Sequence, residues 1–279
     1  MFLTLTAINL RIFSNPLSNV LQKRIAGRGI FSTQINFLTY LGLSLLSIFC
    51  FPKFLNVTGV VWIYAILGGL FGAFGNASLI KALEGGELSV LGPINSYKPV
   101  VAMIFAVFML GEIPSLIGIL GVCLIIYGSY FLFEKGDFRI SLLKRRDIQL
   151  RFVALILTAI EAVFIKNVII LTNIYTAFIF WCLFGAIFSL FITKFKFKSL
   201  CRTDFWQILA LIVCTGIMQM STNYVFARMD VSYALALFQL SALISVIFGW
   251  KFFNESNVLR KILGSGIMVL GAVILILAQ

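Results

Sequence analysis

The sequence is dominated by apolar runs of about 20 residues that recur along nearly the whole chain. A run of that length spans the roughly 30 Å hydrocarbon core of a bilayer as an α-helix, which satisfies its backbone hydrogen bonds internally. The chain is 61% hydrophobic and 11% charged over 279 residues, more apolar surface than one water-soluble core could bury. We therefore predict an all-α integral membrane protein with ten transmembrane helices, at residues 2–22, 30–51, 58–80, 88–110, 115–134, 151–172, 174–193, 205–227, 231–250 and 257–278.

The first run is the least regular, because Arg11, Asn15, Pro16 and Asn19 interrupt it. A signal peptide is disfavoured, since the charge lies inside the apolar region and no small-residue cleavage site follows. We predict a helix that the mature protein retains.

The basic residues are distributed on one side. Of 22 Lys and Arg residues, 17 follow the odd-numbered helices, Arg151 among them, and only Lys53 and Arg228 lie at the opposite side. Cytoplasmic loops carry such an excess, so the pattern predicts a cytoplasmic membrane protein with both termini outside. A basic rim beside anionic lipid accounts for the net charge of +12, and nucleic acid is not predicted as a partner.

The sequence lacks the residues that several kinds of catalytic and metal sites require. The chain has no histidine, no CxxC pair and no glycine-rich phosphate loop of the Walker type. A zinc site, a catalytic triad and ATP-driven transport by this chain alone are therefore disfavoured. We predict no cofactor and no enzymatic activity.

An internal repeat relates the two halves of the chain. At an offset of 143 residues GEIPSLIGILGVCLIIYG, from Gly111, aligns with NESNVLRKILGSGIMVLG, from Asn254, and Ser96 aligns with Gln239. We predict two five-helix repeats, residues 1–134 and 151–279, joined by a basic loop, 135–150. Because five is odd, the second repeat enters the membrane from the opposite side. Inverted repeats favour alternating access, although a duplication kept only for folding gives the same pattern.

The two motifs LGEIPSLIGILGVCLIIYG and FNESNVLRKILGSGIMVLG resemble those of EamA-type members of the drug/metabolite transporter superfamily. The resemblance covers the whole chain. It implies that helices 1 to 4 and 6 to 9 surround a central cavity, with helices 5 and 10 at the periphery. It departs at Asn254, where the family has glycine, and in the orientation of the termini, which are usually cytoplasmic in the family.

Lys98 stands at the middle of a predicted span, directly before Pro99. A charged side chain there is costly in lipid, so it should face the interior of the bundle. Pro99 cannot donate to the carbonyl of Asn95, which predicts a bend with a free carbonyl beside a cation. Lys98 is then either a substrate residue, as a lysine in the fourth span of the related nucleotide-sugar transporters suggests, or the structural partner of a buried acid such as Glu161.

Glu161 is the only carboxylate well inside a predicted span. A desolvated carboxylate favours its protonated form, which makes Glu161 a candidate for proton coupling, or else an ion-pair partner of Arg11 or Lys98. Lys166 aligns with Lys23 across the repeat and is either a gate or a lysine that snorkels to the interface.

Other polar residues within the spans predict the lining of the cavity, or bonds between helices. The full predicted substrate-binding set is Lys98, Asn95, Tyr97, Asn76, Gln219, Asn223, Tyr224, Gln239 and Arg11. Glu112 and Glu255 lie near helix N-termini and are expected to complement the helix dipole. All five prolines belong to the first half, which predicts kinks in spans 1 and 4 but not in spans 6 and 9.

The function predicted from the sequence is a secondary transporter, an exporter or exchanger, of a small polar metabolite that is anionic or amphiphilic. The alternatives are a lipid-headgroup flippase and a non-transporting membrane subunit. The partners are the metabolite and membrane lipid, and both a monomer and a homodimer remain open.

Overall fold

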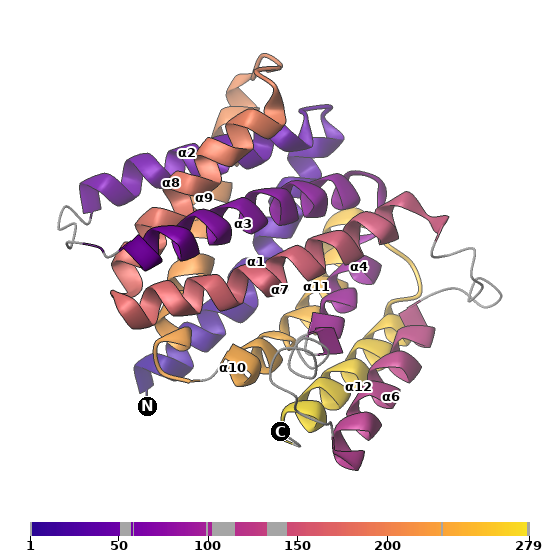
Figure 1. Ribbon diagram of the computed structural model, residues 1–279. Helices are drawn as coiled ribbons and strands as arrows, with labels where there is room; N and C mark the ends of the chain where they lie inside the picture. The colour runs from indigo at the N-terminus through magenta and orange to yellow at the C-terminus, as the bar shows by residue number, and fades with distance from the viewer. Residues whose placement is uncertain are drawn as a thin grey trace.

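The computed structural model describes residues 2–50, 57, 59–98, 100–101, 115–132, 144–229 and 231–277. These residues form helices joined by turns and loops, and the described part of the chain contains no strand (Figure 1). The helices are α1 (Phe2–Gly27), α2 (Ser32–Cys50), α3 (Gly59–Gly85), α4 (Leu88–Ile94), η1 (Asn95–Tyr97), α6 (Leu116–Ser129), η2 (Tyr130–Leu132), α7 (Arg146–Leu171), α8 (Ile174–Thr193), α9 (Arg202–Phe226), α10 (Val231–Phe238), α11 (Ser241–Phe253) and α12 (Val258–Leu277).

Four of these helices, α3, α7, α8 and α9, are long and apolar enough to cross a membrane, judged over the described residues. Large apolar side chains such as Leu116, Ile170 and Phe191 point outward from the bundle, where a soluble protein would place polar ones. The fold is therefore that of a multi-pass membrane protein. That it has ten spans in all stays a prediction.

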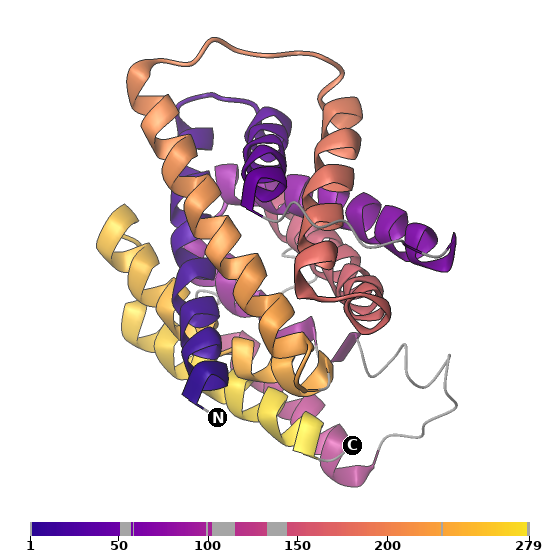
Figure 2. The same ribbon diagram turned by 90° about the vertical axis from the view of Figure 1, so that its left-hand side faces the viewer.

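Helices from the two halves lie side by side. α1 packs against α9, α3 against α7, α2 against α8, and α4 against α11. The repeat matches α1 with α7 and α3 with α9, so the α1–α9 pair and the α3–α7 pair are equivalent. It also matches α2 with α8, and the fourth predicted span, which contains α4, with the ninth, which contains α11, so each of these two pairs joins equivalent spans. α6 and α12 pair at one side of the bundle, as Figures 1 and 2 show.

Small residues let α3 approach α7 and α8 closely. A Cβ added at Gly75 would lie 2.7 Å from Thr158 Cγ2, and one at Gly68 would lie 3.1 Å from Ile165 Cδ1. A Cβ at Gly69 would collide with Phe184 of α8. The glycines of α3 thus bring the two halves into direct backbone proximity, as small residues do in membrane bundles.

The fourth predicted span tightens at its middle. α4 gives way to the 3₁₀ turn η1, where the Asn95 N–H donates to Gly92 O and the Lys98 N–H donates to Asn95 O. The prediction of a free Asn95 carbonyl is therefore wrong, and Lys98 keeps helical angles, φ −55° and ψ −45°. Instead the i→i−3 bonds free the carbonyl of Leu91. Pro99 lies outside the described residues.

The ninth predicted span is also broken, at residues 239–240 between α10 and α11, so the expectation of an unbroken helix there is wrong. No proline is involved. The Leu240 N–H bonds Leu237 O at 3.3 Å, while the Gln239 side chain donates to Leu235 O at 2.7 Å. A side chain that competes for a backbone carbonyl in this way bends a helix.

Candidate functional site: a central cavity between two broken helices

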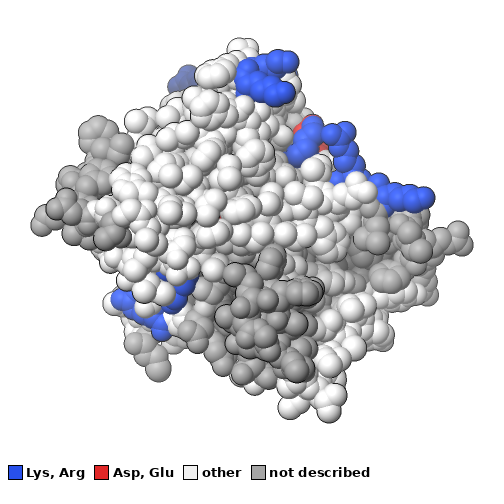
Figure 3. Space-filling model, viewed as in Figure 1, with Lys and Arg blue, Asp and Glu red and all other residues white. Residues whose placement is uncertain are grey.

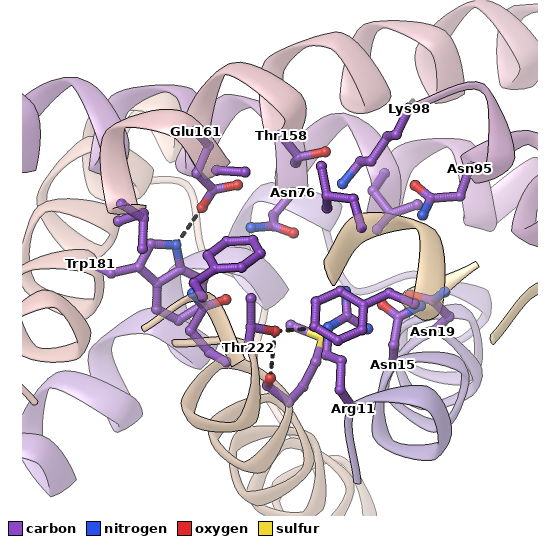
Figure 4. A pocket seen from close by; sticks show the side chains of 18 of the residues that line it. Arg11, Asn15, Asn19, Asn76, Asn95, Lys98, Thr158, Glu161, Trp181 and Thr222 are labelled. Carbon is purple, nitrogen blue, oxygen red and sulfur yellow. Dashed lines mark hydrogen bonds between the residues drawn. The ribbon is translucent and has the colours of Figure 1, made fainter. Parts of the chain in front are cut away.

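A cavity of about 90 Å³ lies at the level of both helix breaks, between the two halves of the chain (Figure 4). Its lining contains three cationic side chains and one carboxylate. The polar residues that line it are Arg11, Asn15, Asn19, Asn76, Asn95, Lys98, Arg151, Thr158, Glu161, Trp181, Gln219 and Thr222.

Arg151 is held on one wall of the cavity by neutral acceptors. It lies one turn into α7, is 5% exposed, and donates from Nε to Leu91 O at 2.7 Å and from Nη2 to Asn95 Oδ1 at 2.8 Å. Leu91 O is the carbonyl that η1 frees. Neither acceptor neutralises the guanidinium, so its positive charge remains available to the cavity.

The Asn95 amide joins the two breaks. Its Nδ2 donates to Gln239 Oε1 at 3.3 Å, and Gln239 in turn donates to Leu235 O. Because Ser96 and Gln239 are equivalent in the repeat, the two helices are interrupted at corresponding positions. Paired interruptions of this kind point to the substrate site of transporters built from inverted repeats.

Arg11 and Lys98 complete the cationic wall. Arg11 donates from Nε to Thr222 Oγ1 at 2.8 Å and lies 5.0 Å over the Phe238 ring, while its Nη1 is buried without a partner. Lys98 is 9% exposed and directs its amine toward the cavity (Figure 4). Within the described residues its amine makes no hydrogen bond or ion pair. Two buried donor groups thus face the cavity with unused capacity.

Glu161 occupies the opposite wall. It is 8% exposed and accepts a hydrogen bond from Trp181 Nε1. Gly72 makes room for it, since a Cβ at Gly72 would collide with the Glu161 carboxylate and lie 3.2 Å from Tyr40 Oη. No ion pair joins Glu161 to Lys98 or Arg11 in the part of the chain that the structure describes. A contact pair with Glu161 therefore does not explain Lys98.

The sequence profile of the EamA-like transporter family matches residues 13–134 and again residues 147–277. The chain belongs to the EamA-like transporter family. Members of this family are multi-pass membrane transporters of the drug/metabolite superfamily rather than enzymes, which confirms the resemblance given by the two motifs.

One crystal structure shares the fold of this EamA-like chain with a TM-score of 0.66 and 17% identity, and the similarity covers 99% of this chain and 96% of that chain. Among curated proteins no sequence matches. At this identity the likeness concerns the fold alone.

Six residues of the predicted site line the cavity of the EamA-like chain: Arg11, Asn76, Asn95, Lys98, Gln219 and Glu161. The other predicted residues lie elsewhere. Tyr97 packs on Phe152 at 5.6 Å, Asn223 donates to Ile174 O at 3.2 Å, and Gln239 bridges the helix breaks. The Arg228 guanidinium lies over the Tyr224 ring, with its central carbon 3.4 Å from the centre of the ring.

Lys166 is not a cavity residue either. Its amine donates to Phe226 O and, at 3.2 Å, to Met229 O. It thereby satisfies carbonyls at the C-terminal end of α9, where a cation is favoured by the helix dipole.

The sequence prediction missed Arg151 and Trp181. Arg151 was assigned to the cytoplasmic rim, because the apolar run starts only there, but α7 begins five residues earlier, at Arg146, and carries it inside. Trp181 and the amides of Asn15 and Asn19 also line the cavity. The amides did carry a signal, since they interrupt the first run one and two turns after Arg11.

The glutamate of the second family motif reaches across to the first half. Glu255 lies between α11 and α12, and its two oxygens accept from the N–H groups of Leu88 and Ser89, each at 2.8 Å, at the start of α4. It also pairs with Lys23 of α1 at 2.8 Å. The prediction that Glu255 complements a helix dipole is right, but the helix belongs to the other repeat. Glu112 lies outside the described residues.

Asn254 replaces the family glycine without loss of the turn. It ends α11 in the left-handed region, at φ 52° and ψ 36°. Asparagine tolerates this conformation better than other residues with a side chain. The turn therefore stays tight enough to aim Glu255 at α4.

Proposed function

We propose that the chain is a secondary transporter that moves a small anionic metabolite by alternating access. The observation that carries the proposal is the charge of the cavity, where Arg11, Lys98 and Arg151 face a single carboxylate, Glu161. Uncompensated positive charge is costly in a low-dielectric interior, so a ligand that brings negative charge is stabilised there. The volume of about 90 Å³ is small beside the 300–1,000 Å³ of drug-sized sites and fits a small metabolite.

Alternating access is supported by the pairing of the helices. The two halves meet along matched contacts, and each contributes one interrupted helix to the cavity. We assign residues 1–134 to the first repeat and start the second repeat at Arg146, where α7 begins, five residues before the predicted boundary at residue 151. Rocking of one repeat against the other opens the site to each side in turn.

The cytoplasmic membrane is the proposed location, with both termini outside. The turns after α1, α3, α8 and α11 lie along the upper and right-hand edges in Figure 1, and the termini lie at the lower edge. Lys and Arg gather mainly along those same upper and right-hand edges in Figure 3. This distribution agrees with the positive-inside bias and supports the proposed orientation of the termini. The proposed direction, export or exchange, comes from the resemblance to the family.

Glu161 is the proposed coupling residue. It is the one carboxylate in the described lining, and a proton gained or lost there changes the net charge of the cavity. Such intramembrane acids are typical of proton relays.

The test is ligand-dependent thermal stability of the purified protein with anionic, zwitterionic and cationic metabolites. A ligand that binds only the folded state raises the melting temperature, and at 100 times its Kd it adds about 2.7 kcal/mol of stability. Anionic compounds should stabilise the wild type and not Lys98→Met or Arg11→Met.

Lys251→Met is the matched control, because Lys251 is an exposed lysine near the end of α11, away from the cavity. It should respond to anions as the wild type does. If no anion stabilises the wild type, and Lys98→Met alters only its basal stability, the flippase or scaffold function replaces the transporter.

A further inference from the structure

A second chamber, of about 30 Å³, adjoins the central cavity. Asn15, Asn19, Asn76 and Trp181 line both spaces, so the two lie side by side. The second chamber differs in its chemistry: hydroxyl and carboxamide groups line it, and its described lining contains no charged side chain.

The chamber follows α1 from the cavity toward the end that carries Lys23. Asn15, Ser18, Asn19 and Gln22 fall on one face of this helix at spacings of three and four residues. Gln22 is seven residues beyond Asn15, about 10 Å further along the axis at 1.5 Å per residue. The chamber therefore extends the site lengthwise.

Gln22 supplies the observation that points to a ligand. It is 6% exposed, and its Oε1 is buried without a hydrogen-bond partner. A buried acceptor without a donor costs about 1–3 kcal/mol. A ligand that donates a hydrogen bond at this point removes the cost.

Two neighbouring side chains, Thr39 and Asn36, also favour a ligand that donates a hydrogen bond. The Thr39 hydroxyl donates to Ile35 O at 2.8 Å, which leaves its oxygen lone pairs as acceptors toward the chamber. Asn36 uses its amide hydrogens on Ala73 O, at 3.0 Å, and Ser189 Oγ, at 2.8 Å. Thr39 and Asn36 therefore still offer mainly acceptor capacity to a ligand. A carboxylate has no proton to donate, but a hydroxyl group has one.

We propose that the second chamber binds the hydroxyl groups of the substrate, and that the substrates are hydroxylated carboxylates. The inference rests on the proposed function, which places the carboxylate in the cavity beside Arg11 and Lys98. The carbon chain then extends toward Gln22, and its hydroxyl groups donate to Gln22 and Thr39. A site built to bond hydroxyl groups rejects the analogue that lacks them, because its own polar groups stay unpaired.

The test compares three six-carbon probes on the purified protein, with Kd taken from the rise in melting temperature. Gluconate carries both the carboxylate and the hydroxyl groups, hexanoate lacks the hydroxyl groups, and sorbitol lacks the carboxylate. Gluconate should bind the wild type at least tenfold more tightly than either of the others.

Gln22→Leu isolates the chamber from the cavity. This variant should bind gluconate about tenfold more weakly, which is the value of one hydrogen bond, and its affinity for hexanoate should be unchanged. Glycerate, a three-carbon acid too short to reach Gln22, should also be unaffected. Because the substitution removes an unpaired buried acceptor, its melting temperature without ligand should equal or exceed that of the wild type.

Two further variants complete the design. Asn9→Leu removes an exposed amide from the same helix and should leave every Kd unchanged. Thr39→Val repeats the test from α2, with the same selective loss of gluconate, should Gln22→Leu fold poorly.

The outcomes separate the inference from the function. Equal affinity for gluconate and hexanoate overturns the inference and leaves anion transport in place. If sorbitol binds as tightly as gluconate, the anionic function is overturned, while the binding of hydroxyl groups in the second chamber stands. If none of the three probes binds, the inference is overturned, and the anion panel above decides the function separately.

Discussion

Replacing Glu255 by glutamine tests the contact that joins the second half of the chain to the first. The carboxylate accepts two backbone hydrogen bonds and one from Lys23, all at 2.8 Å, and its side chain is 5% exposed. Hydrogen bonds to a charged group contribute about 1.5–3 kcal/mol each. Glutamine keeps one acceptor oxygen for the Leu88 N–H and Lys23, but it places an amide donor against the Ser89 N–H and removes the negative charge that pairs with Lys23.

Lys23 recovers part of this loss, because its side chain is 17% exposed and can be hydrated again. We therefore expect Glu255→Gln to lower the free energy of unfolding by about 2–4 kcal/mol. The melting temperature should fall by on the order of 10 °C, with the per-kcal shift taken from soluble domains of similar length.

The assay is thermal unfolding of the purified protein, with Lys23→Met and the double variant completing a double-mutant cycle. A coupling of at least about 1 kcal/mol is expected between residues in direct contact. Glu84→Gln is the control, since it removes an exposed i,i+3 pair with Lys81, for which about 0–1 kcal/mol is typical. Equal effects of Glu255→Gln and Glu84→Gln would refute the reasoning.

The same contact predicts a pH dependence. Burial raises the pKa of Glu255, but the hydrogen bonds from Lys23 and Ser89 together outweigh it and hold the pKa below its ordinary value of 4.5. A carboxyl group whose pKa is lower in the folded state stabilises the fold above the unfolded pKa, and this contribution is lost as the pH falls through the folded pKa. The wild type should therefore lose stability below about pH 4.5 more steeply than Glu255→Gln.

Three other substitutions have defined outcomes. Gly72→Ala places a Cβ against the Glu161 carboxylate and should reduce transport at least tenfold in reconstituted vesicles, with a smaller effect on folded yield. Asn254→Ala should cost about 1 kcal/mol, because alanine disfavours positive φ, whereas Asn254→Gly should leave the melting temperature unchanged or higher. Arg151→Met strips the donors from Leu91 O and should lower stability by about 1–3 kcal/mol, and Arg151→Lys, which restores one donor and the charge, should recover part of the loss and the binding of anions.

The class of fold was predictable because it depends on features that are local in the sequence. Apolar runs of membrane-spanning length and the two glutamate motifs were enough to identify a multi-pass transporter of the EamA-like family. The break at Gln239 was not, because no proline or glycine marks it. It depends on a side chain that bonds a backbone carbonyl of its own helix, a choice that the surrounding helices decide.

A charged cavity residue could be recognised from the sequence when it lay deep inside an apolar run, and not when it lay at the edge of one. Arg11, Lys98 and Glu161 were recognised because a charge in the middle of such a run has few stable places other than a polar interior. Arg151 has the same role, but it lies at the edge of its run, where hydropathy cannot distinguish a loop from the first turns of a helix.

The partners of Arg151 explain why no local signal revealed it. An acidic residue three or four positions away in the sequence would have indicated an ion-pair partner for a buried arginine. Here the acceptors are instead the Leu91 carbonyl and the Asn95 amide, 60 and 56 residues away. The Leu91 carbonyl is free to accept only because the helix tightens into η1 at Asn95. The cation and the break thus depend on each other across the two halves. That dependence leaves the charge of Arg151 unneutralised beside the cavity, which is the condition that the binding of an anion requires.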